Sequence, residues 1–162
     1  MRYILIGVLA AVNTFYVDAA TSDKEIIAIT ILAEARGEGE SGMYAVAAVL
    51  AQRTFNRQLS SRLVCLQSRV VKGRRIHQFS CWNSGRDRKG TKSFHELKSL
   101  LDEPQAKYAL RLGECLANNI KGIDRSYVGY ADHYHNKTVN PYWANKTKKI
   151  KTINNHIFYK LR

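Results

Sequence analysis

The feature that most constrains the fold is a pair of consecutive helical patterns separated by a glycine-rich break. Ser22, followed three residues later by Glu25, is a capping-box signature and predicts a helix from about Asp23 to Arg36. Gly37 is expected to end this helix, as glycine often does at a helix C-terminus. Apolar residues surround the helix, so it should be buried on most sides; they are Ile26, Ile27, Ile29, Ile31 and Leu32.

Two more helices are expected, one directly after the break and one past the middle of the chain. The first runs from about Gly42 to Asn56, with Ser41 as its cap. The second starts near Asp102, has Pro104 in its first turn and continues to about Asn119, before Gly122 breaks the pattern. Their apolar stripes are Met43, Val46, Ala47, Val49 and Leu50 in the first helix, and Tyr108, Leu112, Cys115 and Leu116 in the second.

The last third of the chain changes from helical to strand patterns. The segments 127–135 and 157–159 are rich in β-forming residues, and Asn154 and Asn155 precede the second. We therefore expect an α+β fold, with a small antiparallel sheet after a mainly helical body. Between these parts the signals are mixed: the patches 63–66 and 70–71 fit a helical turn or a strand, and the segments 72–75 and 83–90 look like exposed loops.

The N-terminus has the layout of a secretory signal peptide. Arg2 precedes a mostly apolar run from Tyr3 to Val12, and the small residues Ala19 and Ala20 follow. The pattern predicts a signal peptide over residues 1–19 and a single catalytic domain over residues 20–162, in a secreted, periplasmic or wall-bound protein. A buried N-terminal helix and an uncleaved anchor are the alternatives, although the apolar run is short for a membrane span.

The chain is strongly basic. It has 26 Lys and Arg residues against 13 Asp and Glu residues, a formal net charge of +13 over 162 residues. Such a charge favours a polyanionic partner: nucleic acid, an anionic membrane face or an acidic cell wall. An exported basic protein meets wall polymer first, and the sequence has no recognisable nucleic-acid-binding motif. We expect an anionic wall surface as partner, no nucleic acid, and a monomer.

Three cysteines, Cys65, Cys81 and Cys115, leave two interpretations open. In an oxidising compartment two of them could pair, and Cys65 with Cys81 would close a short loop. The other interpretation is three buried thiols. Neither a CxxC motif nor a cysteine–histidine spacing typical of zinc is present.

Glu34 is an unusual residue for its position. It lies between two alanines at the end of an apolar run, and glycines follow at positions 37, 39 and 42. An apolar setting disfavours the charged form of a carboxyl group, which suits a general acid. The alternative is a buried glutamate paired with Arg36 or Arg53.

Several short motifs then occur in a fixed order. They are AEARGE (33–38) with GM-AVAAVLAQR after it, QFSCW (78–82), ADHYHN (131–136) with PYWA (141–144), and NHIFYK (155–160). In this order they resemble the SleB-type cell-wall hydrolases, which include spore-cortex-lytic enzymes and their bacterial and phage relatives, endolysins among them. The resemblance covers the chain from about Ser22 onwards. It implies a lysozyme-like fold with a glycan-binding groove and cleavage of the MurNAc–GlcNAc β-1,4 bond of peptidoglycan.

The resemblance also places the catalytic acid at Glu34. Cleavage of a glycoside needs an acid that protonates the leaving oxygen. In a lytic transglycosylase the C6 hydroxyl of the muramic sugar attacks the anomeric carbon, so one glutamate can act as acid and then as base. Muramidase-type hydrolysis would instead require a second carboxylate, for which Asp132 and Glu38 are the candidates. We interpret Glu38 as a structural residue, and we expect no cofactor.

The remaining candidates are residues for substrate binding. His133 and His135 lie two apart on an expected strand, so they should face the same way. With His156 they could bind a metal, but we favour a hydrogen-bonding cluster and expect no metal site. Aromatic and polar side chains of the motifs could stack on sugars or bind N-acetyl groups, and a place in the core is the alternative for the aromatic ones. These residues are Gln78, Phe79, Ser80, Trp82, Tyr134, Tyr142 and Trp143.

Two residues depart from the family pattern. Tyr130 stands where a glycine is expected before the Ala-x-His-Tyr-His run, and Asp132 stands where a small or hydroxyl residue is common. These departures keep a second class open, a wall-binding module without catalysis. A third class, a basic nucleic-acid-binding protein, is supported by the net charge alone.

Overall fold

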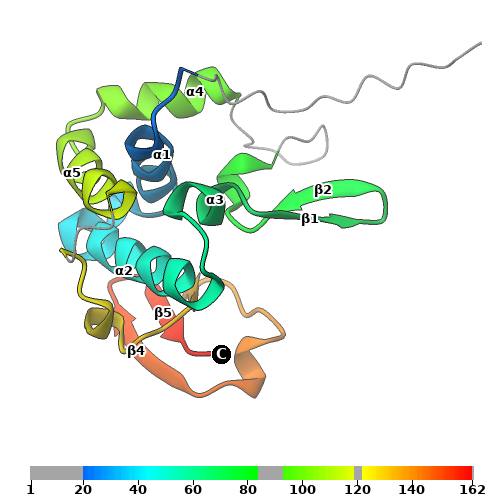
Figure 1. Ribbon diagram of the computed structural model, residues 1–162. Coiled ribbons are helices and arrows are strands. Elements are labelled where there is room, and N and C mark those ends of the chain that lie inside the picture. The colour runs from blue at the N-terminus through cyan, green and yellow to red at the C-terminus, as the bar shows by residue number, and fades with distance from the viewer. Residues whose placement is uncertain (1–19, 84–92, 119–121, 162) are drawn as a thin grey trace, which may run out of the picture.

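The computed structural model describes residues 20–83, 93–118 and 122–161. A body of helices occupies one side of the molecule, and a small sheet lies beside it next to helix α2 (Figure 1). The expected signal peptide and most of the expected loop 83–90 lie outside the described residues. In the part of the chain that is described, no helix is long and apolar enough to cross a membrane.

Helix α1 (Asp23–Ala35) begins as its sequence predicts. The Ser22 hydroxyl accepts a hydrogen bond from the Glu25 backbone N–H, and the Glu25 carboxylate accepts one from the Ser22 N–H at 2.8 Å. The end of the helix differs from the prediction. The chain continues through the 3-10 turn η1 (Arg36–Glu38), and Gly39, not Gly37, has the positive φ of 66°.

Helix α2 (Gly39–Arg57) starts directly at that glycine, three residues earlier than expected. Ser41 therefore lies inside the helix, and its predicted role as a cap is wrong. Its hydroxyl instead accepts a hydrogen bond from the Asn154 side-chain amide at 3.0 Å. The early start leaves no loop between the two helices beyond the 3-10 turn, so the position of Glu34 is set by both of them.

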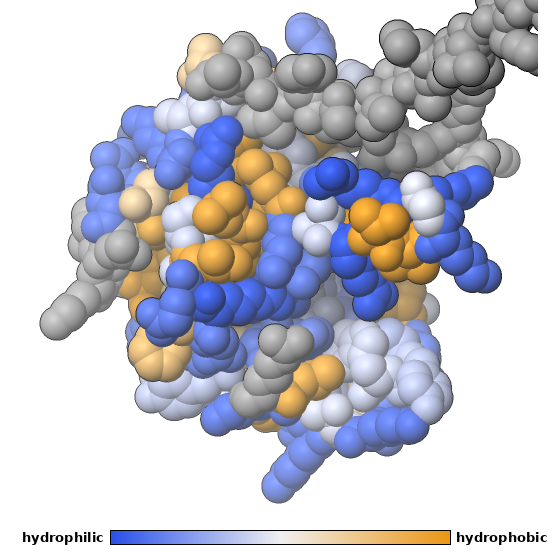
Figure 2. All heavy atoms as spheres, turned by 45° about the vertical axis from the view of Figure 1, so that its right-hand side comes forward, coloured by the Kyte–Doolittle hydropathy of each residue, from blue (hydrophilic) through white to orange (hydrophobic). Residues whose placement is uncertain are grey.

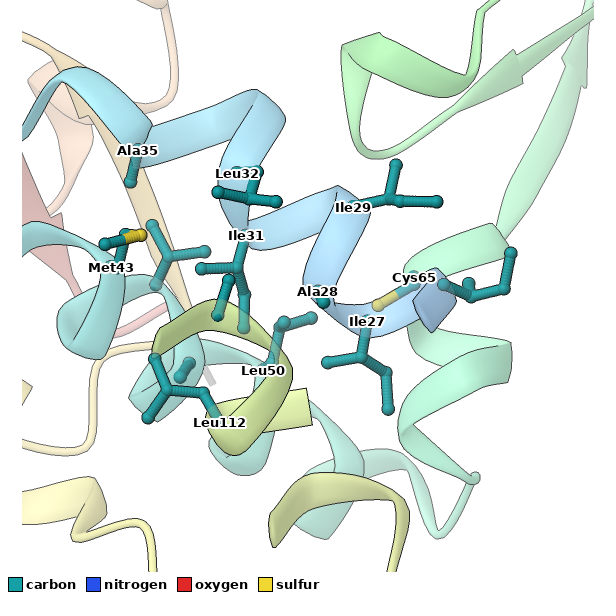
Figure 3. Packing of buried hydrophobic residues seen from close by; sticks show 14 of the residues in the cluster. Ile27, Ala28, Ile29, Ile31, Leu32, Ala35, Met43, Leu50, Cys65 and Leu112 are labelled. Atoms are coloured by element: carbon teal, nitrogen blue, oxygen red, sulfur yellow. The ribbon is translucent and has the colours of Figure 1, made fainter. Parts of the chain in front are cut away.

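The core forms around α1, which other helices cover on several sides. These are α2, α3 (Ser61–Leu66), α4 (Phe94–Lys98) with the 3-10 helix η3 (Ser99–Asp102), and α5 (Ala106–Ala117). Figure 3 shows Ile27, Ile31 and Leu32 of α1 directed at the residues of its neighbours. Helix α5 approaches α1 closely at Gly113, where a Cβ atom would lie 2.4 Å from the Lys24 carbonyl oxygen. Helix α5 starts after Pro104, later than expected.

The sheet follows the helical body, as predicted, and the α+β class is confirmed. Strands β3 (His133–Asn136), β4 (Lys149–Ile153) and β5 (His156–Tyr159) are antiparallel in the order β3-β5-β4. The prediction for segment 127–135 was wrong in its first part, where residues form the 3-10 helix η4 (Arg125–Val128). Strand β4 was not predicted, because its lysines obscure the strand pattern.

A second, separate two-stranded sheet is formed by β1 (Ser68–Val71) and β2 (Arg74–His77). This hairpin projects from the body beyond α3 (Figure 1). Residues 70–71 are thus in a strand, one of the two possibilities left open, while residues 63–66 are helical. Arg74 and Arg75 belong to β2 rather than to a loop, and only Lys72 and Gly73 form the turn.

All three cysteines are described, and all three are free thiols. The suggested disulfide between Cys65 and Cys81 is not formed. The alternative of three buried thiols is correct for Cys65, while Cys81 and Cys115 are only partly buried. Burial raises the pKa of Cys65 to about 12, and the pKa of Cys81 is raised further by the same cause. Both side chains therefore stay protonated at neutral pH.

Candidate active site

Glu34 lies one residue before the end of α1, where the helix emerges from the core. Its side chain is half-buried, between the fully buried Leu32 and the buried Ala35. The Tyr134 hydroxyl, on strand β3, donates a hydrogen bond to Glu34 Oε2 at 2.9 Å. One carboxyl oxygen is thus held by the sheet, which leaves Oε1 as the oxygen that can carry a proton.

The surroundings of Glu34 act on its pKa in opposite directions. Burial raises the pKa, while the hydrogen bond from Tyr134 and the charge of Arg53 lower it; burial prevails, and the pKa is raised. The pKa of Tyr134 is also raised, first by burial and then by the nearby Glu34 carboxyl group. Tyr134 therefore remains a hydrogen-bond donor, and Glu34 keeps its proton to a higher pH than an exposed glutamate would.

Arg53 of α2 lies beside this pair without forming an ion pair among the described residues. It is only 7% exposed, and its Nε donates a hydrogen bond to the Asp132 carbonyl oxygen at 2.7 Å. Its guanidinium carbon lies 5.0 Å from the centroid of the Phe79 ring. Arg36, the other arginine considered as a partner of Glu34, instead lies 3.3 Å from Glu103. Neither arginine neutralises Glu34 by direct contact.

Strand β3 separates the predicted site residues into two groups. Tyr134 faces the helices together with His156 and Phe158, whose ring centroids lie 5.1 and 5.7 Å from its own. His133 and His135 face the same way as each other, as predicted, but they point to the opposite side of the sheet.

On that opposite side, both histidines lie against Trp143. The ring centroids of His133 and His135 are 5.4 and 5.6 Å from that of Trp143. Tyr159, which the sequence reasoning did not identify, completes this cluster: its hydroxyl lies 3.1 Å from His135 Nε2. His156 is not part of the cluster, so the three histidines considered together are not brought together. Within the described residues, no group of three or more potential ligands is placed to hold a metal.

Asp132 is buried and accepts two hydrogen bonds. Only 3% of the residue is exposed, and its Oδ1 accepts hydrogen bonds from His133 Nδ1 and from the Leu161 N–H, both at 2.9 Å. Its Oδ2 is buried without a partner in the described part of the chain. Burial lowers the pKa of His133, although the hydrogen bond to Asp132 opposes this. Asp132 thus holds a neutral His133 with the proton on Nδ1.

Glu38 ties the α1–α2 junction to the turn between β4 and β5. Its two carboxylate oxygens accept hydrogen bonds from the Asn155 N–H at 2.9 Å and from the Asn155 side-chain amide at 3.2 Å. Its carbonyl oxygen accepts a further bond from the Asn154 side chain at 2.7 Å. Burial raises the pKa of Glu38, but the bonds from Asn155 outweigh this effect and leave the pKa lowered. These contacts agree with the structural interpretation.

The segment between β2 and α4 contributes both core and surface residues. Phe79 and Trp82 are buried, and the Trp82 indole N–H donates to Thr30 Oγ1 at 3.1 Å. Both residues belong to the hydrophobic core, whereas Gln78 and Ser80 are exposed. Tyr142 is 74% exposed, with the Lys146 ammonium 4.4 Å from its ring centroid.

Tyr130, the first departure from the family pattern, has a left-handed backbone with φ of 58°. This conformation favours glycine, which explains why a glycine suits this position. The preceding Gly129 is also left-handed, and a Cβ atom there would lie 2.5 Å from Ile150 Cγ2.

The model of the cell wall hydrolase family matches residues 37–159. The chain belongs to this family. The expected resemblance is thus confirmed, and the protein is a cell-wall-degrading enzyme. The match includes Glu38, the QFSCW segment and the sheet, and it begins three residues after Glu34.

Two solved structures are also similar to the chain. The first is the catalytic domain of the germination-specific lytic transglycosylase SleB from Bacillus anthracis. It is 23% identical over 89% of this chain and 100% of that chain, with a TM-score of 0.47. The second is the catalytic domain of SleB from Bacillus cereus, 21% identical over 89% of this chain and 95% of that chain, with a TM-score of 0.44. No curated protein sequence matches the chain.

Proposed function

We propose that this enzyme cleaves the MurNAc–GlcNAc β-1,4 bond of peptidoglycan as a lytic transglycosylase, with Glu34 as its catalytic acid and base. The observation that carries the proposal is the environment of Glu34: a partly exposed carboxyl group whose pKa is raised by burial. Tyr134 fixes one of its oxygens, so that the other is free to deliver a proton. A proton donor of this kind is what cleavage of a glycosidic bond requires.

The proposed reaction needs no second carboxylate. Glu34 Oε1 gives its proton to the glycosidic oxygen as the bond to the anomeric carbon breaks. The C6 hydroxyl of the muramic sugar then forms a bond to that carbon, and its proton passes to the Glu34 carboxylate. The products are a free hydroxyl on the leaving sugar and a 1,6-anhydro end, and Glu34 is protonated again.

Muramidase-type hydrolysis is the alternative, and it has less support from the geometry. It requires a second carboxylate that can activate water or attack the sugar. Both oxygens of Glu38 accept hydrogen bonds from Asn155, and Asp132 is buried while it holds His133. Each would have to give up a structural contact to take part.

The exposed residues among the predicted substrate-binding residues are proposed to bind the glycan strand, whereas Phe79 and Trp82 are buried in the core. Gln78 and Ser80 are exposed on the segment that precedes the buried Trp82, and both can donate hydrogen bonds to N-acetyl groups. Tyr142 offers an exposed ring for stacking on a sugar. We also propose that residues 1–19 are a signal peptide that delivers residues 20–162, as one catalytic domain, to the wall.

The test is mass spectrometry of purified peptidoglycan after digestion by the wild type, by Glu34→Gln and by Glu40→Gln. Glu40 is an exposed carboxylate on the same segment and serves as the matched control. The wild type and Glu40→Gln should release muropeptides with 1,6-anhydro-MurNAc ends. Glu34→Gln should lose roughly 10²- to 10⁴-fold in rate, the usual contribution of a general acid. Reducing MurNAc ends would instead mean that water is the nucleophile, and unchanged activity of Glu34→Gln would remove Glu34 from the mechanism.

A further inference from the structure

The β1–β2 hairpin is a firmly held projection. Its strands pair in register over four residues each, and its turn consists of Lys72 and Gly73, both with positive φ. At its base, the Gln78 N–H donates to the Gln67 carbonyl oxygen at 2.9 Å, and the His77 N–H donates to Asn83 Oδ1 at 2.6 Å. The tip is therefore presented away from the body in a defined orientation (Figure 1).

All charged residues of the hairpin are basic. Arg69, Lys72, Arg74 and Arg75 are all exposed, and the sequence contains no acidic residue between Glu40 and Asp87. The projection thus holds four cations within seven consecutive residues and no acidic residue. A phosphate-bearing surface is the natural partner of such a cluster, because arginine matches phosphate geometry with two parallel hydrogen bonds.

Two branched apolar side chains are exposed among these cations. Val70 is 69% exposed and Val71 is 39% exposed, and neither packs on the core clusters of the described residues. In the register of the hairpin, Val70 lies opposite Arg75 and Val71 opposite Arg74, so each face shows a valine beside a guanidinium. Figure 2 shows that apolar patches on this side of the molecule are bordered by hydrophilic residues.

Strand β4 also carries exposed lysines, and its apolar residue Ile150 can be compared with the two valines. On β4, Ile150 also lies among exposed lysines, but its side chain packs over Gly129. This contact covers part of the Ile150 side chain, and the residue is 40% exposed, about as much as Val71. Val70 and Val71 belong to neither core cluster of the described residues, and a purely hydrophilic polyanion would offer them no apolar contact. A lipid bilayer offers both phosphate groups for the cations and an apolar zone for the valines.

We propose that the β1–β2 hairpin docks on the surface of an anionic lipid bilayer, with Val70 and Val71 entering the headgroup region and the surrounding cations binding lipid phosphates. This surface is distinct from the chemistry at Glu34 and does not depend on it. The attachment would hold the enzyme at a membrane face next to the wall. Because it combines ionic and apolar contacts, it should need both anionic lipid and the valines.

The test is sedimentation of the full chain with vesicles of phosphatidylglycerol and phosphatidylcholine, and with vesicles of phosphatidylcholine alone. Two hairpin variants are compared with the wild type: Arg69→Gln with Arg74→Gln, and Val70→Ser with Val71→Ser. The matched control is Lys148→Gln with Lys149→Gln, which removes the same charge from an exposed segment at β4. Residues 1–19 are present in every variant, so differences report on the hairpin.

The wild type should bind the anionic vesicles and not the phosphatidylcholine vesicles. The arginine variant should lose roughly tenfold or more in affinity, since each cation near an anionic surface contributes measurably. The valine variant should also bind more weakly, while its binding to soluble polyphosphate stays unchanged. Equal loss in the lysine control, or vesicle binding that is unaffected by the valine substitutions, would overturn the proposal. Circular dichroism of each variant verifies that the body remains folded.

Discussion

The hydrogen bond between Tyr134 and Glu34 has two effects that oppose each other. It orients the carboxyl group, and it also stabilises the charged form of that group and lowers its pKa. Burial more than compensates, so Glu34 remains a usable acid. Tyr134 is therefore a positioning residue in the proposed mechanism: it fixes the oxygen that does not react and sets how strongly the other holds its proton.

Replacing Tyr134 by Phe should change the pH dependence of catalysis in a defined direction. The substitution removes a donor that lowers the pKa of Glu34, so the pKa should rise further. Because the protonated form is the active acid, activity is lost as pH rises through this pKa. The alkaline limb of kcat/KM should therefore move to higher pH, while the maximal rate falls by roughly tenfold as orientation is lost.

Tyr127→Phe is the matched control for this prediction, because Tyr127 packs edge-to-face on Tyr44 and does not contact Glu34. Its pH profile should coincide with that of the wild type. An alkaline limb that stays in place in Tyr134→Phe would show that the hydrogen bond does not control the acid. A limb that moves to lower pH would contradict the sign of the argument.

At the scale of helices and strands, the close approach of α5 to α1 depends on one missing side chain. A Cβ atom on Gly113 would lie 2.4 Å from the Lys24 carbonyl oxygen and 3.4 Å from the Ala28 nitrogen. Both are backbone atoms of α1, so they cannot move aside without moving the helix. The contact is therefore steric in origin, and it fixes how tightly the core around α1 closes.

Gly113→Ala should lower the free energy of unfolding by about 1–3 kcal/mol, the usual range for overpacking, despite the higher helix propensity of alanine. Chemical denaturation monitored by circular dichroism measures this change. Gly37→Ala is the control, because nothing lies within 4 Å of the Cβ position there. Equal stability of the two variants would mean that α5 can shift away from α1 without loss.

The Glu38–Asn155 contact is the corresponding link between the helices and the sheet. Glu38→Ala should lower the free energy of unfolding by about 0.5–1.5 kcal/mol, since it removes hydrogen bonds to Asn155 that are exposed and that water can partly replace. Glu38→Gln retains one acceptor oxygen and should keep most of the activity. Thermal unfolding measures the structural role of Glu38, and turnover of purified peptidoglycan measures any catalytic role. A Gln variant that folds normally but is as inactive as Glu34→Gln would make Glu38 a catalytic residue.

The sequence predicted which helices and strands form better than it predicted where they end. The reason is that a sequence pattern records contacts between residues close together in the chain. The capping box at Ser22 involves residues three apart, so its pattern is visible in the sequence and was confirmed. The sequence after Glu34 offers Gly37, Gly39 and Gly42, and only the tertiary fold decides that Gly39 is the one with a positive φ. Residues near Tyr127 favour strands, but Asp124 accepts a hydrogen bond from the Ser126 N–H at 2.8 Å and starts a 3-10 turn instead.

The site shows the same division between local and distant contacts. Glu34 could be singled out from its apolar neighbours, which are adjacent in sequence. Its partner Tyr134 lies 100 residues away, and the sequence suggested a contact with the substrate for it, not a hydrogen bond to Glu34. The engagement of Asp132 with the Leu161 backbone was likewise not visible, because backbone groups carry no sequence signal.

For the whole molecule, the net charge of +13 should dominate attachment to an acidic wall. Attraction between exposed charges is screened by salt: the Debye length falls from about 14 Å at 0.05 M to about 4 Å at 0.5 M. Binding of the Glu34→Gln variant to isolated walls should therefore weaken strongly over this range. The variant is used so that the wall is not consumed, and neutral chitin serves as the control polymer. Pelleting that is independent of salt would mean that contacts with uncharged sugars, and not the charge, hold the enzyme.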